Sequence, residues 1–142
     1  MATVTVPPNY KPTEKEPYMN PVMLEYFRKK LLHWKADIVR EADLTLQELQ
    51  DDGGMQEPDI TDRASAETEV ALELRTRDRQ RKLISKIDEA LERIDRNEYG
   101  FCEETGEPIG IKRLDARPIA TLTVDAQERH ERKERTQRDE RE

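Results

Sequence analysis

Acidic side chains gather in the middle of this chain, and their type suits chemistry with a metal ion. Between residues 41 and 69 there are ten acids and one base, Arg63. Asp59 and Asp62 lie three residues apart where a helix is expected to begin, and the positive end of a helix stabilises carboxylates. Two interpretations are open: the pair caps the helix, or it contacts a hard cation or its water ligands in a partner's active site. A catalytic pair is not expected, because a helical tip offers no pocket that excludes water.

The single cysteine, Cys102, is followed by Thr105 at the position where a two-cysteine zinc knuckle has its second sulfur. A structural zinc site needs about four ligands, and the two histidines, His33 and His130, lie in expected helices. Zinc is therefore not expected, and an intramolecular disulfide is excluded. The sequence favours a small core residue at Cys102 and leaves a redox-sensitive thiol as the alternative.

The spacing of apolar residues predicts an all-α protein with two long helices ahead of a compact, turn-rich segment. Apolar residues recur every three or four positions from Leu24 to Leu49, a pattern typical of a helix with one apolar stripe. A second apolar stripe runs from Val70 to Ile94, with a polar gap between Leu74 and Leu83. Two glycines and a proline separate these helices, so they are expected to pair antiparallel. The expected segments are a flexible proline-rich arm (1–20), a long coiled-coil hairpin (21–97) with its tip at 51–62, a small globular zinc-finger-like knuckle (98–126) and a charged C-terminal helix (127–142).

Two sets of apolar residues are expected to be buried. The inward stripe of the second helix is expected to comprise Val70, Leu74, Leu83, Ile84, Ile87, Leu91 and Ile94. The core of the knuckle is expected to comprise Phe101, Ile109, Ile111, Leu114, Ile119, Leu122 and Val124. Between Leu74 and Leu83 the stripe gives way to eight polar residues with five cations and one anion. This cationic segment is either a solvated stretch of helix or a docking patch for an acidic surface.

Composition argues against several classes of function. Charged residues make up 40% of the chain, the hydrophobic set only 34%, and the formal net charge is −7. So few apolar side chains favour an elongated helical protein over one with a thick core. The negative charge argues against a protein that neutralises nucleic-acid phosphates, so direct DNA binding is not expected. Because no apolar run is long enough for a membrane span or a signal peptide, a cytoplasmic protein is expected.

Three segments of the chain resemble the DksA/TraR family of transcription factors. They are Asp59-Ile60-Thr61-Asp62-Arg63-Ala64, residues 72–79, and residues 100–103 together with 110–118. The resemblance implies a monomeric protein that is not an enzyme, binds bacterial RNA polymerase rather than DNA, and inserts its hairpin through the secondary channel. The sequence departs from the family pattern at the knuckle, where only the first of the four usual cysteine positions (102, 105, 123 and 126) holds a cysteine. The chain therefore resembles the cysteine-poor branch, and a metal-free knuckle is expected.

The resemblance also implies roles for residues of the hairpin. Asp59, Asp62 and Ala64 would be the tip residues that alter promoter complexes. Arg75 and Arg79 would face the polymerase along the shaft, which makes the cationic segment a docking face.

A second set of residues matches family positions that bind the alarmone guanosine tetraphosphate (ppGpp) at the polymerase interface. These are Leu83, Lys86 and Arg117, while Gln127 replaces the usual lysine of a fourth position. The implied function is control of open-complex stability together with ppGpp in the stringent response, with repression of stable-RNA promoters and activation of biosynthetic ones.

Two other functions remain as alternatives. A GreA-type transcript-cleavage factor also presents an acidic hairpin tip, although this sequence shows no C-terminal β-barrel signal. A structural coiled-coil adaptor would carry the tip without using it. Exchange of Asp62 for Asn separates these functions, because transcription would respond in a regulator and not in an adaptor.

Overall fold

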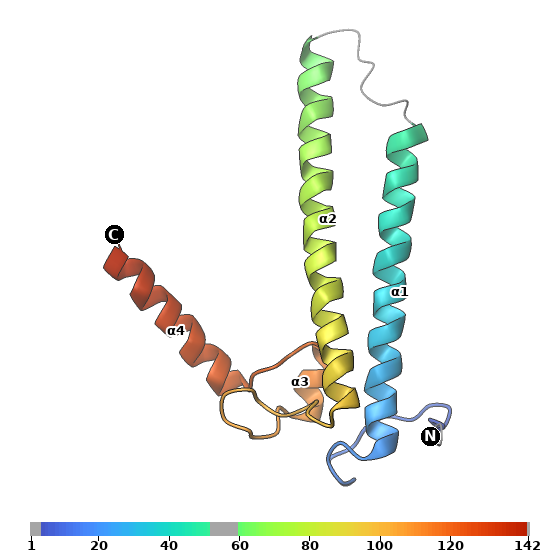
Figure 1. Ribbon diagram of the computed structural model, residues 1–142, viewed down its shortest axis with the longest axis vertical. Helices are drawn as coiled ribbons and strands as arrows, with labels where there is room; N and C mark the ends of the chain where they lie inside the picture. The colour runs from blue at the N-terminus through green and yellow to red at the C-terminus, as the bar shows by residue number, and fades with distance from the viewer. Residues whose placement is uncertain (1–3, 52–59, 142) are drawn as a thin grey trace. The chain divides into compact units, whose positions relative to one another are not determined.

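The computed structural model describes residues 4–51 and 60–141, and within its helices it leaves the side chains of residues 49–51, 60–63 and 139–141 undescribed. Its helices are α1 (Pro21–Asp51), α2 (Ile60–Asp95), α3 (Ile111–Ala116) and α4 (Val124–Arg141), shown in Figure 1. The described residues form no strand, only one isolated bridge between Phe101 and Pro108, and the all-α prediction is confirmed for them. None of the described helices combines the length and the apolar character that a membrane span requires.

The chain divides into two compact units, and α1 and α2 each contribute to both. The hairpin unit consists of Leu32–Glu89. The knuckle unit consists of Met1–Leu31 and Ala90–Glu142. The four segments expected from the sequence are not tested by this division and stay predictions.

Helix α1 begins where a side-chain cap and a proline meet. The Oδ1 of Asn20 accepts a hydrogen bond of 3.0 Å from the N–H of Met23, and Pro21 takes the first helical position, where its missing N–H costs nothing. In the knuckle unit, Met23, Phe27 and Leu31 are fully buried. Because they are spaced four apart they form one apolar stripe, and burying each side chain stabilises the fold by about 1.5–3 kcal/mol.

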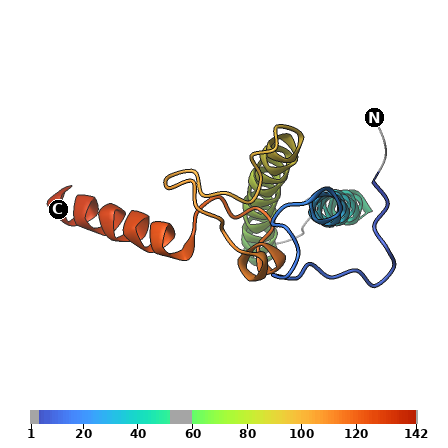
Figure 2. The same ribbon diagram turned by 90° about the horizontal axis from the view of Figure 1, so that it is seen from below.

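Within the hairpin unit, α1 and α2 lie side by side and run in opposite directions (Figures 1 and 2). Ile38 of α1 and Ile87 of α2 are buried. Lys35 of α1 donates a hydrogen bond of 2.7 Å to Asp88 of α2 and so links the two helices. The predicted antiparallel hairpin is confirmed in this unit.

The inward stripe of α2 differs from the predicted one near the middle of the helix. The sequence predicts that Leu74 faces inward, yet this side chain is 59% exposed. The half-buried positions are instead Glu73, Arg77 and Gln80, at steps of four and three that lead on to the buried Ile87. The prediction for Leu74 is wrong because the inward-facing positions continue along one side of the helix, and Leu74, one residue after Glu73, does not lie on that side.

The core of the knuckle unit agrees only in part with its predicted set. Ile109, Leu114 and Ile119 are buried as predicted, whereas Val124 is 50% exposed. The prediction for Val124 is wrong because this residue begins α4, and its side chain lies on the exposed side of the first turn. Buried residues outside the predicted set include Tyr99, Cys102, Ala120 and Ala126.

Tyr18, in the segment ahead of α1, ties two turns of the knuckle together. Its hydroxyl donates a hydrogen bond of 2.6 Å to the carbonyl oxygen of Gly100 and accepts one of 3.1 Å from the N–H of Gly110. Its ring meets the Phe101 ring edge-on at 5.5 Å between centroids. Gly100 has a φ of 94°, and a Cβ there would lie only 2.9 Å from the Cγ of Met19, so glycine is required at this close approach.

Substitution of Tyr18 by Phe is expected to lower the free energy of unfolding by about 1–3 kcal/mol, because it leaves two backbone groups without their partner. Urea unfolding followed by circular dichroism measures the change. Tyr10→Phe is the control, since the Tyr10 hydroxyl donates a hydrogen bond of 2.8 Å to the Glu16 side chain rather than bridging two backbone groups. An equal loss in the two variants would show that the bridge across the knuckle carries no special stability.

Candidate functional site

The tip residues proposed from the sequence lie at the edge of the described structure. Asp59 lies outside the described residues. Asp62 and Ala64 are in the first turns of α2, and Ala64 is exposed. The roles of all three residues stay predictions.

The proposed shaft residues, Arg75 and Arg79, are both exposed on α2 in the hairpin unit. Their spacing of four residues places them on one face of the helix. Between them in sequence, Asp78 forms an ion pair of 3.1 Å with Lys82. The half-buried Arg77 lies on the inward stripe, so Arg75 and Arg79 present the cationic face of the shaft to solvent.

The three proposed alarmone residues are divided between the two units. Leu83 is half-buried and Lys86 is exposed, both in the hairpin unit. Arg117 is exposed and follows α3 in the knuckle unit. The grouping of the three residues into one binding site stays a prediction.

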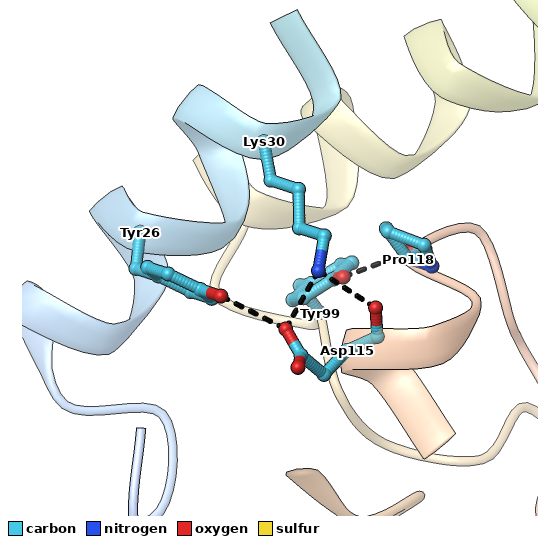
Figure 3. Close-up of polar contacts among 5 residues, drawn as sticks. All are labelled: Tyr26, Lys30, Tyr99, Asp115 and Pro118. Carbon is cyan, nitrogen blue, oxygen red and sulfur yellow. Dashed lines mark hydrogen bonds and ion pairs between the residues drawn. The ribbon is translucent and has the colours of Figure 1, made fainter. Parts of the chain in front are cut away.

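A polar cluster that sequence reasoning missed joins α1 to α3 within the knuckle unit (Figure 3). The Oδ1 of Asp115 accepts hydrogen bonds of 2.9 Å from the Tyr26 hydroxyl and 2.6 Å from Lys30 Nζ. Lys30 Nζ also donates to the carbonyl oxygen of Asp115 at 2.7 Å. The sequence separates Lys30 from Asp115 by 85 residues, so no local pattern signals the contact.

The pKa values of Tyr26 and Asp115 determine which groups in this cluster donate hydrogen bonds and which accept them. Burial, together with the hydrogen bond to Asp115 and the charge of that carboxylate, raises the pKa of Tyr26 to about 12. The hydrogen bond from Lys30 lowers the pKa of Asp115 below its ordinary value. At neutral pH, therefore, Tyr26 stays protonated and donates its hydroxyl hydrogen, while Asp115 stays ionised and accepts.

Cys102 is buried in the knuckle, with only 4% of its surface exposed. Burial alone raises the pKa of this thiol, but hydrogen bonds to the sulfur outweigh burial and lower the pKa from 9.0 to about 7. The groups that lower the pKa are the hydroxyl and N–H of Thr105 and the N–H groups of Thr123 and Glu104. The Thr123 hydroxyl also donates to the sulfur at 4.0 Å. The loop thus surrounds one sulfur with donors that stabilise a thiolate.

Thr123 and Ala126, at two of the positions where the family resemblance places cysteines, lie at the start of α4. The Thr123 hydroxyl oxygen accepts a hydrogen bond of 3.2 Å from the N–H of Ala126, and its carbonyl accepts one of 2.9 Å from Gln127. Thr123 is therefore the N-cap of the helix. Ala126 has no exposed surface, so these two positions stabilise the helix start by capping and packing.

The free energy of unfolding is expected to rise as the pH increases from 7 to 9. The folded thiol of Cys102 has a pKa of about 7 against 9.0 ordinarily, so the unfolded chain binds more protons in this range. The stabilisation that comes from ionisation of Cys102 is complete above pH 9 and is lost as the pH falls through 7. Urea unfolding at both pH values tests this, and Cys102→Ala should remove the difference. A rise of equal size in that variant would contradict the assignment to Cys102.

Two family models together match most of the chain. The model for the N-terminal domain of the DnaK suppressor protein DksA matches residues 23–94. The model for the prokaryotic dksA/traR C4-type zinc finger matches residues 97–132. The first match covers most of α1 and α2, and the second covers the knuckle and the first half of α4.

Individual relatives agree with the family models. The chain is 60% identical over 139 residues to the RNA polymerase-binding transcription factor DksA of Caulobacter vibrioides (strain NA1000 / CB15N), with 97% of each chain covered. It is 44% identical over 116 residues to the protein of the same name from Escherichia coli (strain K12), covering 82% of this chain and 76% of that protein. The solved structure of transcription factor DksA2 from Pseudomonas aeruginosa is 43% identical with a TM-score of 0.74, covering 83% of this chain and 90% of that one.

The residues of the knuckle do not fit the four-cysteine zinc site after which the second family model is named. The chain has one cysteine, and the other three positions hold Thr105, Thr123 and Ala126. Within the described ranges, no group of three or more His, Cys, Asp or Glu side chains is placed to hold a metal ion. A metal-free knuckle stays a prediction, and one tightly held zinc per chain in a metal analysis would contradict it.

Proposed function

Because this chain belongs to the DksA family, we propose that it regulates transcription by binding RNA polymerase and has no enzymatic activity of its own. The observation that carries the proposal is the 60% and 44% sequence identity, over 97% and 82% of this chain, to proteins named RNA polymerase-binding transcription factors. The exposed arginines of the hairpin unit support it, because they offer a cationic face to an acidic protein surface. The protein binds polymerase directly as a monomer, does not bind DNA and acts in the cytoplasm.

The hairpin enters the secondary channel of the polymerase and brings its tip toward the catalytic magnesium. A pair of helices suits such a channel, because α2 alone has 36 residues and is about 54 Å long. Asp59, Asp62 and Ala64 act at the tip, where carboxylates can contact the magnesium ion or its water ligands. Arg75 and Arg79 bind the wall of the channel along the shaft.

The alarmone ppGpp binds where Leu83, Lys86 and Arg117 meet the polymerase. Arginine binds phosphate oxygens through two parallel hydrogen bonds, and lysine adds a compact positive charge. Gln127 contributes no charge, and its side-chain amide donates a hydrogen bond of 3.2 Å to Glu131. The fourth position therefore interacts more weakly with phosphates than a lysine does.

Multi-round transcription in vitro from a stable-RNA promoter tests the proposed function. With purified bacterial RNA polymerase, the protein is expected to reduce transcript yield, and ppGpp is expected to strengthen the reduction. Failure of polymerase to retain the protein would overturn the proposal. Stimulated cleavage of a backtracked RNA would favour the GreA-type function, and retention with no effect on transcription would favour the adaptor.

A further inference from the structure

Arg117 has an exposed side chain, while its backbone N–H and carbonyl are both held by hydrogen bonds. Its N–H donates a hydrogen bond of 2.8 Å to the carbonyl oxygen of Arg113, closing the last turn of α3. Its own carbonyl accepts one of 3.0 Å from the N–H of Ala120. Both polar backbone groups of Arg117 are therefore committed, while the side chain faces solvent.

The carbonyl groups on either side of Arg117 are held by side chains from other parts of the knuckle unit. Lys30 Nζ donates to the carbonyl oxygen of Asp115 at 2.7 Å. The Tyr99 hydroxyl donates to the carbonyl oxygen of Pro118 at 2.7 Å. Figure 3 shows both contacts, with Lys30 reaching from α1 and Tyr99 from the segment after α2. Arg117 lies between these two anchored carbonyls.

The side chain of Asp115 completes the attachment of α3 to α1. One carboxylate oxygen accepts hydrogen bonds from both Tyr26 and Lys30. The ammonium of Lys30 lies 5.8 Å from the centre of the Tyr26 ring, and the ring of Tyr10 meets Tyr26 edge-on at 5.9 Å. The direction in which Arg117 leaves α3 is thus coupled to side chains of α1.

We propose that Asp115, with its partners Lys30 and Tyr26, forms a positioning cluster that holds Arg117 in place for the phosphates of ppGpp. The inference rests on the proposed function, because it gives a role to the alarmone residue Arg117. A residue whose backbone is already fixed loses less conformational freedom when it binds a ligand. The cluster acts through Arg117 and makes no contact with the alarmone itself.

A second ion pair supplies a matched control. Lys35 and Asp88 of the hairpin unit are 2.7 Å apart, with side chains 37% and 50% exposed. Lys30 and Asp115 are 2.6 Å apart, with side chains 36% and 49% exposed. Pairs this exposed add little to stability. A difference between the Lys30 and Lys35 variants therefore reports on the position of Lys30 and on its bond to the Asp115 carbonyl, and not on the loss of an ion pair alone.

The test measures the ppGpp concentration that gives half of the maximal effect on transcription by polymerase with the full-length protein. Lys30→Met is expected to raise this concentration about fivefold to tenfold, a cost of about 1–1.4 kcal/mol in alarmone binding. Lys35→Met should change it less than about twofold. Lys30→Arg should restore most of the response, because guanidinium keeps the charge and the donors. Affinity for polymerase without ppGpp should be unchanged in all three variants.

Combination with Arg117→Ala separates positioning from a structural role. The Lys30→Met/Arg117→Ala protein should respond to ppGpp as Arg117→Ala does alone, because the cluster has nothing left to position. Additive losses, or equal effects of Lys30→Met and Lys35→Met, would overturn the inference alone. A wild-type protein that binds polymerase but shows no ppGpp response would overturn both the inference and the alarmone part of the proposed function.

Discussion

Replacement of both Arg75 and Arg79 by Glu is expected to weaken binding to RNA polymerase by at least about 100-fold. Both side chains are exposed on one face of α2, four residues apart. A charge pair that becomes desolvated in an interface loses about 2 kcal/mol or more when one partner is removed, and reversal adds repulsion. Two such losses exceed the roughly 2.7 kcal/mol that corresponds to 100-fold. Fluorescence anisotropy of labelled protein titrated with polymerase measures the change.

The matched control for this double variant lies on α4. Arg129 and Lys133 are also exposed, also four residues apart, and their replacement by Glu changes the net charge by the same amount. This control should weaken binding far less, because no docking role is proposed for α4. If the two double variants lose equal affinity, the effect reflects overall charge, and the cationic segment is a solvated stretch of helix rather than a docking face.

The sequence predicts the hairpin well because its signals are local and repeated. Pro21 and the three-and-four spacing that follows it predict a helix that the structure begins at the same residue. The same reasoning fails at Leu74, where apolar character suggests burial and the phase of the helix exposes the side chain. Periodicity predicts that a helix exists more reliably than it predicts which residue faces inward at each turn.

The site is less predictable, because its contacts join residues far apart in the chain. The link from Lys30 to Asp115 spans 85 positions, and the link from Tyr18 to Gly110 spans 92. Neither residue pair belongs to a motif, so only the folded chain shows that they meet. Similarly, the single Cys102 predicts that a zinc site is incomplete, but the hydrogen bonds that surround its sulfur depend on how the loops fold.

Substitution of Asp62 by Asn is expected to remove most of the effect on promoter complexes, reducing inhibition of a stable-RNA promoter by at least about tenfold. Asparagine keeps the size of aspartate, and Asp62 lies inside the first turn of α2, so the change to the helix is limited to one charge near its N-terminus. What it loses is the charge that favours contact with a magnesium ion or its water ligands. The measurement is the protein concentration needed for half-maximal inhibition in multi-round transcription.

Affinity for polymerase should stay within about twofold in the Asp62 variant, because the proposed function assigns docking to the shaft arginines and regulation to the tip. Asp43→Asn is the control, since Asp43 is an exposed acid of α1 in the same unit and the chemical change is identical. That variant should inhibit as the wild type does. A large loss of polymerase binding in the Asp62 variant would show that the tip contributes to docking rather than to regulation. Undiminished inhibition would instead assign its acids to capping, the interpretation that spacing alone leaves open.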